Sequence, residues 1–336
     1  MSTEYTASKY EITIMNKLFL ITATLLALTI NIALATEKPC ASNASYHSIV
    51  DAQDKRLIAG YEFTITKEGT FIVKQGDKQV YSNCDLYDEV IEETKGLNET
   101  VGIAWHISFK DDKSMLLEPA VGEDITGDGI PKLVISYSYH ATYCCGSVVI
   151  FELGKEFKKI AKIKGGSWGV GFSDINGDKR PEVILTDNNY FGWHQGDAEL
   201  DYPNPPIVFG WNGTEYVLRP DLMRKDPPPL PELEKQAKLI SEDKKWGNKY
   251  EVKNIPVALI QNAMRLMYKG HEELGWKFAK MAWSSKFPVD DIFFTEWRKL
   301  MAQNPVWQAI INNRAMPVSD IKTALEIEIA RKNNHK

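Results

Sequence analysis

Two short segments of the chain are versions of each other, and they constrain its fold more than any other feature. Residues 124–135 read DITGDGIPKLVI, and residues 174–185, fifty positions later, read DINGDKRPEVIL. Each places oxygen-bearing side chains at loop positions one, three and five and then continues into an apolar, β-branched run. Alternate residues of a tight loop can direct their oxygens at one centre, which suits a hard cation such as Ca²⁺. The pair therefore predicts calcium loops that lead into β-strands.

Apolar runs recur in the same order after both loops. Strands are expected at residues 133–139, 147–151 and 157–163 after the first loop, and at 183–185, 206–211 and 216–218 after the second. A strand-built period of about 50 residues is typical of a propeller blade or a related β-repeat. Two copies are too few to close a propeller, so we expect a partial, propeller-like domain. Residues 61–81 add a small β-meander to it.

The pattern changes after residue 222. Four prolines within residues 227–231 predict an extended linker over residues 223–235. Beyond it the apolar period becomes 3.6, with helices expected around 259–267, 274–282 and 293–301, after Pro305, and after a cap at Ser319 or Asp320. The predicted fold class is α+β: an N-terminal β-repeat domain at residues 36–222 and a small C-terminal all-α domain at residues 236–336.

Residues 1–35 predict export. Met15 is followed by Asn16-Lys17 and by a mostly apolar run at 18–35 that ends in Ala-Leu-Ala. This is the pattern of a secretory signal peptide, with Met15 as the true start and cleavage after Ala35. A membrane anchor is the alternative, because about 18 apolar residues nearly span a bilayer. The polar residues that follow favour cleavage, and hence a periplasmic or secreted protein with no stable membrane span after signal removal.

The formal charge of -5 is unevenly spread. Residues 36–220 carry a net charge of -10, and residues 221–336 carry +5. The acidic part contains both predicted calcium loops. Because the basic part has no long Lys/Arg run, the sequence gives little support to nucleic-acid binding.

Four cysteines follow the predicted signal: Cys40, Cys84, Cys144 and Cys145. Outside the cytosol an even count suggests disulfides, here with three alternative pairings. Bridges from the adjacent pair to Cys40 and Cys84 are slightly favoured over a strained vicinal ring. A redox or copper site that combines His140 with the adjacent pair is another reading of the same stretch.

The two loops resemble the FG-GAP and VCBS type of calcium-binding β-repeat, which occurs in integrin-like propellers and in many secreted bacterial proteins. By position, the resemblance implies that the ligands of loop one (residues 124–132) are Asp124, Thr126, Asp128 and the Ile130 carbonyl. It implies that those of loop two (residues 174–182) are Asp174, Asn176, Asp178, the Arg180 carbonyl and Glu182. The implied cofactor is one or two structural Ca²⁺ ions.

Each loop departs from the family pattern once. The ninth position of loop one is Lys132 instead of an acid, which removes a ligand and adds a positive charge. Loop two has Lys179 where glycine is expected. If that position needs positive φ, the lysine costs about 1 kcal/mol. Loop two is therefore expected to be the better calcium site.

No catalytic residues are identified, because the sequence contains no zincin motif, nucleophile elbow or phosphate loop. We therefore expect a binding or interaction module at the cell envelope, with an envelope protein or glycan as partner. An envelope hydrolase that acts on polysaccharide or another polymer is the alternative.

Overall fold

The structure, a computed structural model, describes thirteen stretches of the chain. They are residues 46–48, 54–65, 70–93, 103–110, 118–139, 146–166, 169–191, 193, 203–244, 246, 255–286, 291–323 and 326–327. The fold is mixed α and β, and no sheet within these stretches closes into a barrel. The predicted signal region lies outside them.

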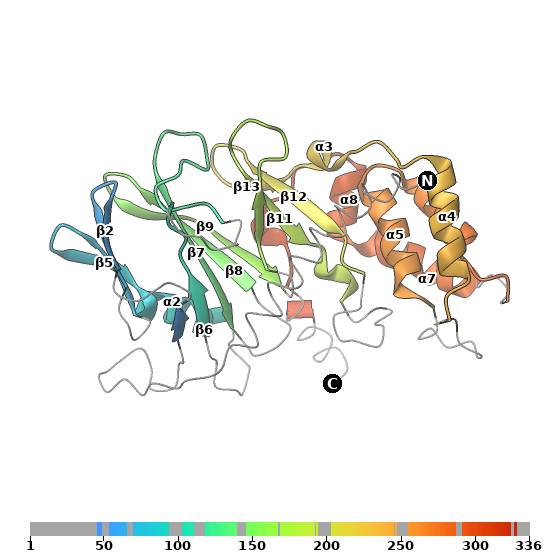
Figure 1. Cartoon of the computed structure of the whole chain (residues 1–336), viewed down its shortest axis with the longest axis horizontal. Helices are drawn as coiled ribbons and strands as arrows, with labels where there is room; N and C mark the ends of the chain where they lie inside the picture. The colour runs from blue at the N-terminus through green and yellow to red at the C-terminus, as the bar shows by residue number, and fades with distance from the viewer. Residues whose placement is uncertain are drawn as a thin grey trace, which may run out of the picture.

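Three sheets and a group of helices follow one another along the molecule (Figure 1). The meander sheet consists of β2 (Asp54–Ile58), β3 (Tyr61–Ile65), β4 (Phe71–Gln75) and β5 (Lys78–Ser82). The central sheet has the order β1 (Tyr46–Ser48), β6 (Ile103–His106), β7 (Lys132–Tyr139), β8 (Gly146–Leu153) and β9 (Phe157–Gly166). The helix-side sheet consists of β10 (Gly171–Ser173), β11 (Glu182–Thr186), β12 (Pro206–Trp211) and β13 (Tyr216–Leu218). Only β1 and β6 pair in parallel among the described strands.

The two loop-containing segments form equivalent units. Loop one is followed by the antiparallel strands β7, β8 and β9, and loop two by β11, β12 and β13. All six strands agree with the runs predicted from the sequence. In each unit the ninth loop residue begins the first strand and hydrogen-bonds or pairs with the residue before the loop, Glu123 or Ser173. The duplication seen in the sequence is therefore a duplication of backbone structure.

The central sheet is buried on both faces. Leu133 and Ile135 of β7 belong to the core shared with the meander sheet, whereas Val134 between them belongs to the core shared with the helix-side sheet and the helices. Adjacent residues of β8 alternate in the same way: Val149 faces the first core and Ile150 the second. Side chains of a strand point alternately to its two faces. A strand covered on both sides therefore reads as a continuous apolar run.

Helices occupy the other end of the molecule (Figure 1). They are α3 (Pro220–Met223), α4 (Leu230–Ser241), α5 (Val257–Tyr268), α6 (Glu272–Met281), α7 (Asp291–Gln303) and α8 (Pro305–Ile311), with the 3₁₀ turn η3 at Val318–Asp320. Gly275 brings α6 close to α5, because a Cβ there would collide with Met267 and lie 2.7 Å from the Ala263 carbonyl oxygen. The apolar core of these helices is continuous with that of the helix-side sheet across residue 222, where the sequence predicts a domain boundary.

The chain returns to the sheets after the helices. Leu218 donates a backbone hydrogen bond to the Met316 carbonyl at 2.8 Å, and Val217 forms a β-bridge with Pro317. Further on, Glu326 Oε1 lies 2.7 Å from Lys164 Nζ of β9. Met316 and Pro317 therefore cover part of the edge strand β13, and Glu326 contacts the central sheet.

Three local predictions need correction. Helix α4 begins at Leu230, inside the segment predicted as a linker, because Pro231 lies in the first helical turn, where no backbone N–H is needed. The acidic residues 85–98 predict a loop with a short helix around 87–94, but the helix begins earlier, as α2 (Asn83–Glu93). Ser319 and Asp320 do not begin a helix, because they lie inside the 3₁₀ turn η3, and beyond it Thr323 and Glu326 exchange hydrogen bonds.

The double burial of β8 predicts a large effect of one truncation. Ile150→Ala should lower the free energy of unfolding by about 2–5 kcal/mol, because it removes buried contacts and leaves a cavity. Leu57→Ala on β2 is the control, since Leu57 is 77% exposed and should change stability by about 0.5 kcal/mol or less. Urea unfolding followed by tryptophan fluorescence measures both, and equal effects would contradict this description of the core.

Candidate functional site

Loop one is ordered around the carboxylate of Asp124. Asp124 Oδ1 accepts the backbone N–H groups of Thr126 and Gly127, and Oδ2 accepts that of Gly129. The side chain of Lys132 turns back beneath the loop, and its Nζ donates to Asp128 Oδ1 at 2.6 Å and to the Ile130 carbonyl oxygen at 2.7 Å. The centre of loop one therefore contains an ammonium group.

The charge of Lys132 acts on Asp128. Burial raises the pKa of the Asp128 carboxyl, but hydrogen bonds from Lys132 and from the Ile130 backbone outweigh it. The positive charge of Lys132 lowers it further. The pKa of Asp128 consequently lies below its ordinary value, and Asp128 is an anion at neutral pH.

Loop two has the same backbone and a different centre. Asp174 accepts the backbone N–H groups of Gly177 and Lys179, as Asp124 does at the equivalent positions. The ninth residue is Glu182, whose buried carboxylate accepts the Ile175 N–H at 2.7 Å and Asn176 Nδ2 at 2.9 Å. The predicted positive φ is present, with +79° at Gly129 in loop one and +68° at Lys179 here.

The two loops are neighbours. A Cβ on Gly127 of loop one would collide with the Arg180 side chain of loop two. The Arg180 guanidinium donates to Asp178 Oδ2 at 2.7 Å, and this hydrogen bond is the main cause of the lowered pKa of Asp178. The predicted ligand residues of both loops therefore gather at one end of the two sheets, in two separate sets.

Loop two fits a divalent cation by its donor chemistry. Three carboxylates, those of Asp174, Asp178 and Glu182, lie within nine residues of one tight loop, and hard cations prefer such oxygens. Glu182 is 4% exposed, and its hydrogen-bond donors, the Ile175 backbone and the Asn176 amide, are neutral N–H groups. In the described part of the chain, however, no group of three His, Cys, Asp or Glu side chains is already arranged around a metal position. Binding would require Asn176 and Arg180 to turn away from the acids.

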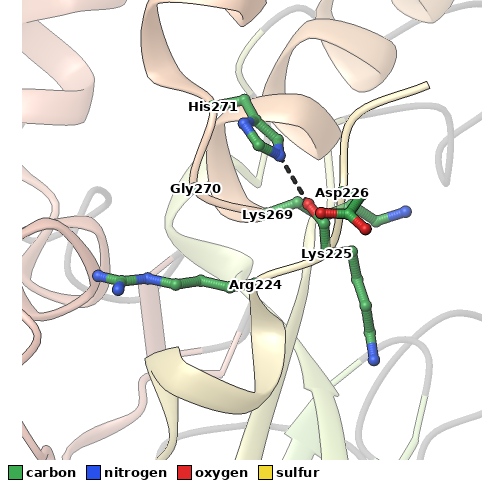
Figure 2. A pocket seen from close by; sticks show the side chains of 6 residues that line it. All are labelled: Arg224, Lys225, Asp226, Lys269, Gly270 and His271. Carbon is green, nitrogen blue, oxygen red and sulfur yellow. Dashed lines mark hydrogen bonds between the residues drawn. The ribbon is translucent and has the colours of Figure 1, made fainter. Parts of the chain in front are cut away.

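A second candidate site is a basic depression at the start of the helical part. Figure 2 shows the lining residues, which come from the segment after α3 and from the turn between α5 and α6. They are Arg224, Lys225, Asp226, Lys269, Gly270 and His271, around a volume of about 400 Å³.

The backbone of the depression is fixed by two contacts. His271 Nε2 lies 2.6 Å from the Lys225 carbonyl oxygen, so this nitrogen is the protonated donor of the ring. The Lys225 N–H also donates to the Lys269 carbonyl at 3.4 Å. The long cationic side chains themselves diverge (Figure 2). The depression therefore presents a spread positive surface on a defined backbone.

A buried polar network joins the helix-side sheet to the helices. Asp187, which follows β11 and is 0% exposed, accepts hydrogen bonds from Tyr268 Oη at 2.6 Å and Asn304 Nδ2 at 2.7 Å. Tyr268 uses its hydroxyl proton to donate to Asp187. In the 3.0 Å contact between the two hydroxyl groups, Tyr190 is therefore the donor and Tyr268 Oη the acceptor. Burial, reinforced by the charge of Asp187, raises the pKa of Tyr268 well above its ordinary value. Both phenols therefore remain protonated, and the network serves as a structural junction.

Sequence reasoning missed this junction and the basic depression. Asp187-Asn188-Asn189, a polar run directly after an apolar strand, was the available signal for the junction. A third missed feature is the contact of the buried His106 with the partly buried Glu118, whose Oε2 lies 2.7 Å from His106 Nδ1. Trp193, between β11 and β12, is partly buried against the core and stacks on Phe293 of α7 with 6.0 Å between ring centroids.

The cysteine predictions fall mostly outside the described residues. Cys84, in α2, is disulfide-bonded, and no described cysteine is free. Cys40, His140, Cys144 and Cys145 lie outside the described residues, so the pairing and the redox reading stay predictions.

Comparison of the chain with protein-family models, curated protein sequences and solved structures gives no match. Among the described helices, none is long and apolar enough to cross a bilayer. Function must therefore be argued from the loops and the depression themselves.

The buried network predicts a strong effect of a nearly isosteric change. Asp187→Asn should lower the free energy of unfolding by about 2–4 kcal/mol, because it weakens charge-assisted hydrogen bonds from Tyr268 and Asn304 in a fully buried place. Asp221→Asn is the matched control: Asp221 also accepts charged hydrogen bonds, from Arg219, but its side chain is 51% exposed. That change should cost about 1 kcal/mol or less. Urea unfolding distinguishes them, and an Asp187 effect no larger than the control would refute the junction.

Proposed function

We propose that this protein is a binding module of the cell envelope, periplasmic or secreted, whose basic depression takes an anionic polymer and whose loop two is stabilised by one structural Ca²⁺. In this proposal the two loop-containing units are calcium-type β-repeats of a partial, propeller-like domain. The partner is an envelope glycan that carries carboxylate or phosphate groups.

The observation that carries the proposal is the charge of the depression. Arg224, Lys225 and Lys269 contribute three cations, and within the described residues none of them lies within 4.0 Å of a carboxylate. One acid, Asp226, accompanies them. Cations that are not engaged by the protein's own acids attract anionic ligands and raise their local concentration.

The divergence of the side chains indicates the kind of anion. A single small anion is held best by donors that converge on it. Spread cations suit charges that repeat along a chain. No Phe, Tyr or Trp side chain lines the depression, so it lacks the large aromatic stacking surface on which single-stranded nucleic acids are commonly bound. These features favour a glycan over a nucleic acid.

The enzyme alternative has less support in the described residues. Hydrolysis of a glycan commonly uses two carboxyl groups that face the scissile bond. The basic depression has one acid, and the buried carboxylate of Asp187 is closed off by Tyr268 and Asn304. No specific contact favours a hydrolase.

Removal of two cations should weaken polymer binding. Arg224→Ala/Lys269→Ala should raise the Kd for polygalacturonate, a polycarboxylate probe, about tenfold, since two exposed charge contacts contribute roughly 1.4 kcal/mol together. The matched control, Lys277→Ala/Lys280→Ala, removes two exposed charges from α6 outside the depression and should leave the Kd within about twofold. Calorimetry at low and moderate salt measures both. A double variant that binds like wild type, or tighter binding of single-stranded DNA, would refute the glycan proposal.

Calcium should stabilise the protein through loop two. After metal removal, Ca²⁺ at about 100 times its Kd should add roughly 2.7 kcal/mol to the free energy of unfolding. Asp174→Ala should abolish this gain, whereas Asp77→Ala, an exposed acid in the β4–β5 turn, should retain it. Thermal and urea unfolding in EDTA and in millimolar Ca²⁺ provide the measurement. A calcium gain that survives Asp174→Ala would rule out loop two as its source.

A further inference from the structure

The ninth residues of the two loops occupy equivalent backbone positions and carry opposite charges. Lys132 and Glu182 both begin a strand, both are buried, and both turn their side chains back beneath the loop that precedes them. In loop two the turned side chain adds a third carboxylate. In loop one it adds a cation.

The ammonium of Lys132 contacts the oxygens that would bind a metal. Its Nζ lies 2.6 Å from Asp128 Oδ1, 2.7 Å from the Ile130 carbonyl oxygen and 4.0 Å from Asp124 Oδ1. These are three of the four ligand groups that the calcium-loop resemblance implies for loop one. Hydrogen bonds of 2.6–2.7 Å from an ammonium to a carboxylate and a carbonyl are charge-assisted and strong.

The burial of Lys132 indicates that the contact of its ammonium with the loop oxygens is permanent, unlike an ion pair on the surface. The side chain is 0% exposed, and a lysine so deeply buried is costly unless its charge is compensated. The two loop carboxylates provide the compensation. A divalent cation in loop one would lie next to the ammonium and be repelled by it. Lys132 could move away only if its buried aliphatic side chain left its place beneath the loop.

We propose that Lys132 is a built-in cation of loop one: its ammonium, placed among Asp128, Ile130 and Asp124, substitutes for the divalent ion and holds the turn without metal. Loop one is therefore a metal-independent copy of a calcium loop. It stays ordered at any calcium concentration and contributes no calcium to the stoichiometry of the protein. The inference concerns loop one alone and stands whether or not loop two binds calcium.

A restored acid at the ninth position tests the proposal. We expect metal-stripped Asp174→Ala, which retains Lys132, to bind no Ca²⁺ in calorimetry, and Asp174→Ala/Lys132→Glu to bind one. The added Glu reproduces the ninth residue of loop two. The double variant should also be less stable than Asp174→Ala in EDTA and regain stability in millimolar Ca²⁺.

A neutral side chain keeps the test decisive if the Glu variant does not fold. Lys132→Met retains the apolar stem and removes the charge, so the unfolding equilibrium constant in EDTA should rise at least tenfold. Lys158→Met on β9 removes an exposed lysine and should change that constant less than threefold. Two results would overturn the proposal: calcium bound by Asp174→Ala and lost in Asp124→Ala/Asp174→Ala, or Lys132→Met as stable as wild type.

Discussion

Strands β7 and β8 have apolar contacts on both of their faces, and most of the architecture depends on this. Odd and even positions of the same strand enter different cores, one shared with the meander sheet and one shared with the helices. A change in the register of β7 or β8 by one residue would exchange the two sets and disturb both cores together. The strands that follow loop one thus fix the position of the meander on one side and of β10–β13 on the other. Each loop lies directly before the first strand of its unit, where a small shift of the backbone would be transmitted to both cores.

The two loops illustrate how a repeated backbone can carry different chemistry. Asp124 and Asp174 make the same hydrogen bonds to the backbone N–H groups that follow them, and the fourth and sixth positions of both loops are left-handed, so these positions shape the turn. The ninth side chain then decides what the centre contains. This division separates the residues that shape the loop from the residue that sets its charge. A motif search that scores the pattern as a whole does not make this distinction.

Much of the fold could be predicted from local pattern. The strands after each loop are continuous apolar runs with clear ends, and helices α5 to α7 keep a 3.6-residue period. Strand β2 was missed because none of its described side chains, those of residues 55–58, is buried, and the strand forms by pairing with β3. Helix α4 was missed because the prolines before it were interpreted as helix breakers, although a first-turn proline is tolerated.

The sites were harder to predict because they combine distant segments. Asp187 meets Tyr268 and Asn304, which lie 81 and 117 positions further along the chain, and no local pattern reports such a meeting. The basic depression likewise joins the segment after α3 to the α5–α6 turn. In loop one all the residues are close in sequence, and the difficulty is a different one. The sequence reveals the lysine at position nine and its charge, but only the folded side chain shows that the ammonium reaches the centre.

The return of the chain to the helix-side sheet at Met316 and Pro317 has a consequence for solubility. Strand β13 ends the helix-side sheet, and an uncovered final strand offers free N–H and C=O groups to any passing extended chain. Met316 accepts a hydrogen bond from Leu218 at the edge of β13, and Pro317 forms a β-bridge with Val217. Proline has no N–H with which to pair a further strand. The segment at Met316 and Pro317 thus hinders edge-to-edge pairing between copies of the protein. A chain that lost it would keep its loops and its depression and become prone to aggregate.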